Sequence, residues 1–258
     1  MRGLDPGPTL TDALLTPVLA RDPARPLVTY YDDATGERIE LSGTTLANWA
    51  AKTANLLRDE CDLEPGGRVA VLLPAHWQTL AVLLGAWWCG AEVVTGVDLD
   101  DPVDVACCDA DRLQSACAAD VPVVVALSLH ALGAGLADLP AGVVDFATEV
   151  RAHGDVFTPD GDAGAAVLDG RGAAEVLADA RAAAAEAGLT VTSRVLTARD
   201  WSAPADGTGG GADGLVEVPL AVLAAGGSLV QCRNLEPGTA EATLDRRATT
   251  ERVTHRLG

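Results

Sequence analysis

The sequence predicts an α/β protein in which helices flank a mostly parallel sheet. Continuous apolar runs such as RVAVLLP (68–74) are typical of strands that are covered on both faces. These runs alternate with segments of helical spacing, and such alternation predicts parallel strands joined by crossover helices. With 258 residues, 48% of them hydrophobic, the chain is long enough to bury a sizeable core.

The first part of the chain predicts a helix, a hairpin and a second helix. The first helix is expected over 9–20, with Pro17 as a point where it kinks. Two β-rich runs, 26–31 and 37–41, flank a turn that contains glycine, as in a hairpin. The segment 42–44 offers N-cap oxygens for the second helix, whose apolar residues recur at helical spacing.

The middle of the chain alternates strands and helices. Strands are expected at 68–74, 92–98, 103–109 and 121–127, and helices at 76–89 and 110–117. The segment 76–89 is strongly apolar, and Gly90 suits its C-terminal cap. The pattern predicts parallel pairing of these strands.

The chain is then irregular over 128–164 before the alternation resumes. Strands are expected at 165–168, 193–197 and 228–232, and helices at 172–187, 215–225 and 239–248. The low-complexity segment SAPADGTGGGADG (202–214) predicts a mobile loop. We therefore expect a single domain over 1–258.

The net charge of −19 limits the classes of partner. It repels phosphate backbones and anionic lipids, so neither nucleic acid nor a membrane is expected as a partner. No signal peptide or membrane span is expected, because the start lacks an apolar stretch and the longest apolar run, 80–91, is too short. The six cysteines lack CxxC spacing and have mostly apolar neighbours, as in a cytoplasmic protein with buried free thiols. We expect a cytoplasmic protein without a cofactor.

Acidic residues gather after the expected strand 92–98, at Asp98, Asp100, Asp101 and Asp104. Ligands bind beyond the carboxyl ends of strands in open α/β sheets, and clustered carboxylates bind Mg²⁺. Turn and cap chemistry on a solvated edge is the favoured explanation, so no metal is expected. The four histidines are scattered and neither HExxH nor GxSxG occurs, so the sequence supports neither a zinc site nor a hydrolase triad.

Two other motifs have both a functional and a structural explanation. The glycine-rich ADGTGGGADG (205–214), which includes Thr208, has the composition of a phosphate-binding loop. No apolar strand precedes it and it contains no lysine, so a flexible loop is favoured. The vicinal Cys107 and Cys108 have the arrangement of a redox or soft-metal pair, but without a second pair or a nearby histidine, core packing is favoured.

Four segments carry a resemblance to a known family. GGRVAVLLPAHWQTLAVLLGAWWCGAEVVTGVDLD (66–100) resembles a strand, apolar helix and strand of the adenylate-forming superfamily, which includes the acyl-CoA synthetases. ELSGTTLANWAAKTANLL (40–57) resembles a helix upstream of that unit. AAEVLADARAAAAEAGLTVTSRVLT (173–197) resembles the helix and strand after the family's phosphate loop, and GLVEVPLAVLAAGGSLVQC (214–232) resembles the next unit. The resemblance implies the fold of the N-terminal subdomain of acyl-CoA synthetases.

The resemblance breaks at the phosphate loop. In the family a loop of the form TSGTTGxPKG joins strand to helix, whereas here only DGRG (169–172) joins AAVL to AAEVLADA. The hydroxyls, most of the glycines and the lysine that would hold ATP phosphates are missing. The family's YGxTE segment, ribose-binding Asp and catalytic lysine have no counterpart, and Lys52, the only lysine, falls in an expected helix. The chain resembles short actinobacterial proteins that lack the same loop.

These departures favour a catalytically inactive relative that binds a protein partner or a small ligand, acyl or nucleotide-like. Two alternatives stay open: half of a split AMP-forming ligase that acts with a separate chain, and a structural or assembly module that forms a homo-oligomer. No catalytic residue is expected. The candidate ligand-binding residues, which lie near expected strand ends, are Asp98, Asp100, Asp169, Gly170 and Gly172.

Overall fold

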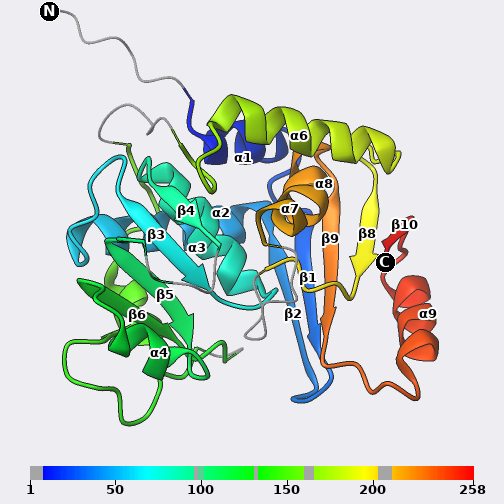
Figure 1. The fold of residues 1–258 in the computed structure, drawn as a ribbon. Helices are drawn as coiled ribbons and strands as arrows, with labels where there is room; N and C mark the ends of the chain where they lie inside the picture. The colour runs from blue at the N-terminus through cyan, green and yellow to red at the C-terminus, as the bar shows by residue number, and fades with distance from the viewer. Residues whose placement is uncertain (1–7, 96–98, 100, 131–132, 160–165, 203–210) are drawn as a thin grey trace, which may run out of the picture.

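The computed structural model describes residues 8–95, 99, 101–130, 133–159, 166–202 and 211–258. Their strands form two five-stranded sheets, sheet A in the order β10-β8-β9-β1-β2 and sheet B in the order β4-β3-β5-β6-β7 (Figure 1). Neighbouring strands pair in parallel except β1 and β2, which form an antiparallel hairpin. The expected mostly parallel α/β fold is confirmed, but its strands are divided between two sheets.

Sheet A combines strands from both ends of the chain. They are β1 (Pro26–Asp32), β2 (Glu37–Ser42), β8 (Arg194–Thr197), β9 (Ser228–Arg233) and β10 (His255–Leu257). The hairpin between β1 and β2 turns at Gly36, whose φ of 76° is strained for other residues. Because β1 also pairs with β9, the expected N-terminal hairpin becomes the edge of a larger sheet.

Sheet B comes from one continuous part of the chain. Its strands are β3 (Arg68–Leu72), β4 (Glu92–Val94), β5 (Val105–Asp109), β6 (Val123–Leu127) and β7 (Val144–Asp145). The short β7 falls within the segment that was expected to be irregular. The strand expected at 165–168 is wrong for the residues that the structure describes there, because Leu168 makes only isolated bridges, to Val93 and Arg171.

Helices cover the sheets, and most of them begin close to their expected positions. They are α1 (Leu10–Arg21), α2 (Gly43–Asp59), α3 (Trp77–Trp88), α4 (Leu113–Ala118), α5 (Phe146–Glu149), α6 (Ala173–Glu186), α7 (Gly211–Leu215), α8 (Ala221–Ala224) and α9 (Ala240–Thr250). Thr9 caps α1 in a capping box with Asp12, and Ser42 caps α2 by accepting a hydrogen bond from the Thr45 N–H.

Two helical stretches depart from α geometry. A 3₁₀ turn, η1 (Val150–Ala152), follows α5, and a π-helical segment, η2 (Val216–Leu220), joins α7 to α8. Pro219 lies inside η2. Because proline has no N–H to donate, the helix expected over 215–225 is interrupted there.

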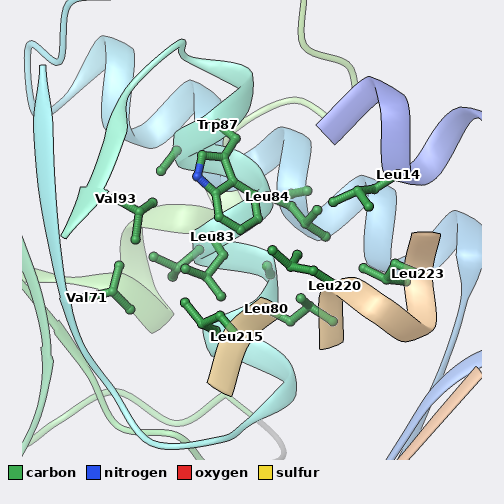
Figure 2. Packing of buried hydrophobic residues seen from close by; sticks show 14 of the residues in the cluster. Leu14, Val71, Leu80, Leu83, Leu84, Trp87, Val93, Leu215, Leu220 and Leu223 are labelled. Atoms are coloured by element: carbon green, nitrogen blue, oxygen red, sulfur yellow. The ribbon is translucent and has the colours of Figure 1, made fainter. Parts of the chain in front are cut away.

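Helix α3 lies at the centre of the core. Every residue from Trp77 to Trp87 is buried, and α3 contacts β1 of sheet A as well as β3 and β4 of sheet B. A Cβ atom at Gly85 would lie 2.9 Å from the Thr53 Cβ, so glycine lets α2 approach α3 closely. Figure 2 shows the residues that pack around α3, which include Leu14, Val71, Val93, Leu215, Leu220 and Leu223.

Glu251 fastens the C-terminal segment to sheet A. Its carboxylate accepts hydrogen bonds from the Tyr31 hydroxyl (2.6 Å) and from the guanidinium groups of Arg38 (2.9 Å) and Arg194 (2.5 Å). Burial acts to raise the pKa of Glu251, but these hydrogen bonds outweigh it and lower the pKa to about 2. The residues that follow, expected to be a tail, pair with β8 as strand β10.

Candidate functional site

The segment DGRG forms a tight turn between Leu168 and Arg171. The Arg171 N–H donates to the Leu168 carbonyl (2.9 Å), and the Val167 N–H donates to the Arg171 carbonyl (2.8 Å). Asp169 and Gly170 have φ values of 42° and 79°. Positive φ at both central positions characterises the hairpin turn for which Asp-Gly is strongly preferred. The dipeptide therefore dictates a closed turn at this junction.

The turn is bound to the end of β4. The Asp169 N–H donates to the Val93 carbonyl (3.0 Å), and the Gly170 N–H donates to Glu92 Oε1 (2.8 Å). The Asp169 carboxylate accepts hydrogen bonds from the Thr95 N–H (3.0 Å) and the Thr95 hydroxyl (2.6 Å). The backbone donors of residues 169–171 and the Asp169 side chain are thus all used within the protein.

Helix α6 begins directly after the turn. Gly172 is its N-cap and provides no side-chain hydrogen bond. Ala174 and Glu175, in the first turn of the helix, are exposed. Arg171 pairs with carboxylates of Asp179 (3.7 Å) and Asp213 (3.4 Å). The start of α6 therefore faces solvent, and the charged side chains around it are mainly acidic.

Of the expected ligand-binding residues, the structure brings together Asp169, Gly170 and Gly172, while Asp98 and Asp100 lie outside the described residues. Asp104 accepts a hydrogen bond from the Arg68 N–H (2.7 Å), which is the turn-and-cap role favoured from the sequence. Thr208 also lies outside the described residues. Among the residues that the structure does describe, no three His, Cys, Asp or Glu side chains are grouped as metal ligands would be.

Sequence reasoning missed a buried polar cluster at the start of α3, where β1, β3 and β9 end. His76 caps α3, and its Nδ1 accepts the Gln78 N–H (3.1 Å). This assigns the ring proton to Nε2, which is buried without a hydrogen-bond partner. Burial and then the charge of Arg233 lower the pKa of His76 to about 3, so the ring is neutral.

Tyr30 and Asp32 complete this cluster from β1. The Tyr30 ring meets His76 edge-on, with 4.4 Å between centroids, and its hydroxyl donates to Asp32 Oδ2 (3.1 Å). Burial acts to raise the pKa of Asp32, but hydrogen bonds from Asn234, Ala34 and Tyr30 lower it. In the sequence, this cluster was indicated only by a histidine placed directly before a strongly apolar helix.

A second connection joins the start of α3 to sheet A. The Ala75 N–H donates to Asp200 Oδ1 (3.0 Å), and the Ser202 hydroxyl donates to the Leu73 carbonyl. Trp201 lies between Asp200 and Ser202 in the sequence, and its Nε1 donates to Gln231 Oε1 (2.7 Å). The loops that follow β3 and β8 are thereby fixed to each other at the edge where α/β sheets bind ligands.

Lys52 and the adjacent Cys107 and Cys108 have structural roles. Lys52 Nζ donates to the His153 carbonyl (2.5 Å) and pairs with Asp155 (2.9 Å). Cys107 and Cys108 are free and buried in β5, and burial raises the pKa of both thiols. Since the thiolate is the reactive form, neither cysteine has the features of a nucleophile or a redox centre.

No family model matches the sequence. A protein of Mycobacterium tuberculosis, "TIGR03089 family protein", is 52% identical over 254 residues, which cover 96% of this chain and 98% of that relative. The chain belongs to the TIGR03089 family. The name of the family states no activity.

Solved structures show which fold this TIGR03089 family member has. An acyl-CoA synthetase of Brucella canis matches with a TM-score of 0.74 and 19% identity, over 96% of this chain and 46% of that structure. MatB of Rhodopseudomonas palustris gives 0.68 and 19%, over 96% and 48%. A benzoate CoA ligase of Burkholderia xenovorans gives 0.66 and 15%, over 97% and 50%. The chain spans about half of these structures and has the α/β fold of acyl-CoA synthetase N-terminal domains, as the sequence resemblance implied.

Proposed function

We propose that this protein is a non-catalytic relative of the AMP-forming ligases that binds a protein partner or a small ligand, acyl or nucleotide-like. The observation that carries the proposal is the closed turn at 168–171. A loop that holds ATP phosphates must direct several backbone N–H groups, and usually a lysine, at them. The N–H groups of Asp169, Gly170 and Arg171 donate to protein acceptors instead.

The charges around the turn support the same proposal. Adenylation joins an acyl carboxylate to the α-phosphate of ATP, so the site must offset developing negative charge. Here the carboxylates of Glu92 and Asp169 belong to the hydrogen-bond network of the turn, and Arg171 is already paired with two aspartates. A polyphosphate at this junction would face like charges, which lowers its affinity.

The proposal is tested by ATP–pyrophosphate exchange over a panel of carboxylic acids, with isothermal titration of MgATP in parallel. We expect no exchange above the protein-free background. An intact acyl-CoA synthetase, assayed under the same conditions, serves as the positive control. Robust exchange by the purified chain would refute the proposal.

The length of the match supports a second candidate function, half of a split AMP-forming ligase. The chain covers 46–50% of the ligase structures described above, and a separate chain would then supply the YGxTE and catalytic-lysine segments. Purification of the tagged protein from its native host should recover such a chain in stoichiometric amount. Recovery of a homo-oligomer alone would count against the split ligase and in favour of an assembly module.

The cysteines support placing this function in the cytoplasm. Cys61, Cys89, Cys107, Cys108 and Cys232 are buried free thiols, and proteins of oxidising compartments commonly pair theirs. Among the described residues, no helix has the length and apolarity needed to cross a membrane. Fractionation of the native host with an antibody against the chain tests the location, and recovery in a secreted fraction would contradict it.

A further inference from the structure

A pocket of about 130 Å³ lies between α1, α6 and α8, three helices that contact one another near the top of Figure 1. Its apolar lining includes Val18 of α1, Leu177 of α6 and Leu223 of α8. In its wall, Arg25 directly precedes β1 and Gly226 lies two residues before β9. The pocket is therefore at the opposite end of sheet A from the cluster around His76.

The charged residues at this pocket are mainly basic, although the chain carries a net charge of −19. Arg21, Arg25 and Arg181 line it together with one acidic residue, Asp22. The guanidinium group of Arg25 is fixed, because it donates to the carbonyls of Val191 (2.8 Å), Gly226 (2.8 Å) and Gly227 (3.1 Å). It closes the wall of the pocket between α8 and β8.

Arg21 and Arg181 have a different status from Arg25. Both are exposed at the rim, one at the end of α1 and the other on α6. Within the described part of the chain, neither guanidinium group has an ion-pair or hydrogen-bond partner. Two unpaired guanidinium groups beside an apolar lining offer complementary surfaces to the two ends of an amphiphilic anion.

We propose that this pocket binds a small amphiphilic monocarboxylate. The hydrocarbon end packs on Val18, Leu177 and Leu223, and the carboxylate pairs with Arg21 and Arg181. Asp22 at the rim disfavours a second negative charge on the ligand. This inference rests on the proposed function only in that the protein binds a small ligand, and it assigns that ligand a site and a chemical class.

The volume of the pocket limits the length of the hydrocarbon. A series of acetate, butanoate, hexanoate and decanoate, titrated into the full chain and followed by NMR chemical shifts, measures this limit. Each added methylene that enters the pocket should tighten binding about fourfold, until the pocket is full and the gain stops. Affinity that does not depend on chain length would overturn the proposal.

The charge requirement is tested with variants. Arg21→Gln combined with Arg181→Gln should weaken hexanoate binding about tenfold, because two exposed charge pairs are lost. Arg252→Gln, an exposed arginine outside the pocket, should leave the affinity unchanged. Hexan-1-ol, which lacks the charge, should bind wild type and double variant equally. Unchanged hexanoate binding in the double variant would refute the site. A dimer that forms in wild type and is lost in the double variant, as measured by sedimentation, would also refute it, because the two arginines would then belong to an interface between copies of the chain.

The two proposals fail separately. Failure of hexanoate to bind would refute the pocket but would leave the outcome of the pyrophosphate-exchange assay unaffected. Exchange by the wild-type chain would refute the non-catalytic role, whereas saturable hexanoate binding that needs Arg21 and Arg181 would still establish the pocket.

Discussion

Helices α3 and α6 both start directly after segments that join sheet B, yet their surroundings are opposite. In α3 every residue from Trp77 to Trp87 is buried, and the side chain of His76 caps the helix. In α6 only Val176, Ala180 and Ala184 are buried, and the cap is a glycine. The start of α3 is thus buried in the core, whereas the start of α6 follows a backbone turn and otherwise faces solvent. Substitutions at the start of α6 should therefore cost much less stability than substitutions in α3.

The largest expected effect is at a hydrogen bond that joins the two regions. Trp87 of α3 is fully buried, and its Nε1 donates to the Val167 carbonyl beside the turn (2.7 Å). Trp87→Ala should lower the free energy of unfolding by about 3–5 kcal/mol in urea titrations. Val176→Ala in α6 should lower the free energy of unfolding by about 2 kcal/mol. Trp87→Phe, which keeps an aromatic ring, should cause a smaller loss than Trp87→Ala. Equal losses for Val176→Ala and Trp87→Ala would contradict the contrast between the helices.

The next effect depends on pH and involves the cap of α3. The folded-state pKa of His76 is about 3, below the ordinary value of about 6.5, so between these values the unfolded chain binds a proton that the folded chain excludes. The stability contributed by neutral His76 is complete above pH 6.5 and is lost as the pH falls towards 3. Relative to pH 7, we expect a loss of about 2 kcal/mol at pH 5.

The variant His76→Asn isolates this effect. Asparagine is a good N-cap residue but does not titrate. The free energy of unfolding of the variant should therefore depend less on pH between 7 and 5, although the variant should be less stable than wild type at pH 7. Urea titrations at pH 7 and pH 5 give the change in the free energy of unfolding for each protein. An equal change in wild type and His76→Asn would show that His76 is protonated in the folded protein as readily as in the unfolded chain.

The smallest effect is expected at the turn before α6. Asp169→Gly keeps a residue that accepts positive φ but removes both hydrogen bonds to Thr95, which is buried. The loss should be about 1–2 kcal/mol, and hydrogen exchange of the Thr95 amide should accelerate. Asp169→Asn, which keeps an acceptor and tolerates the turn, should cost less. If Asp169→Asn is as damaging as Asp169→Gly, the charge of the carboxylate and not its geometry holds the turn.

Local features of the sequence were sufficient for much of the fold. Capping residues such as Thr9 and Ser42 marked helix starts, and the apolar run 76–89 predicted α3 to within one residue at each end. The division into two sheets was not predictable in this way. It depends on the pairing of β1 with β9, which joins opposite ends of the chain, and nothing within either strand encodes its partner.

The candidate site was predictable to a similar degree. The sequence showed DGRG as a short connection between the expected strand and helix, but Thr95 and Glu92, which bind the turn, lie 74 and 78 residues away in sequence. His76 was missed because the fully buried state of a single histidine follows from tertiary packing, not from its neighbours in the chain. The pocket between α1, α6 and α8 has the same origin, since its arginines come from distant segments.

Lys52 gives the molecule a useful chemical property. It is the only lysine in the chain, and its ammonium group links α2 to the segment that contains His153 and Asp155. An acylating reagent directed at lysine, or a protease that cleaves after lysine, therefore has one side-chain target, and this target is protected while the link is closed. The rate of modification at Lys52 directly measures how often α2 separates from that segment.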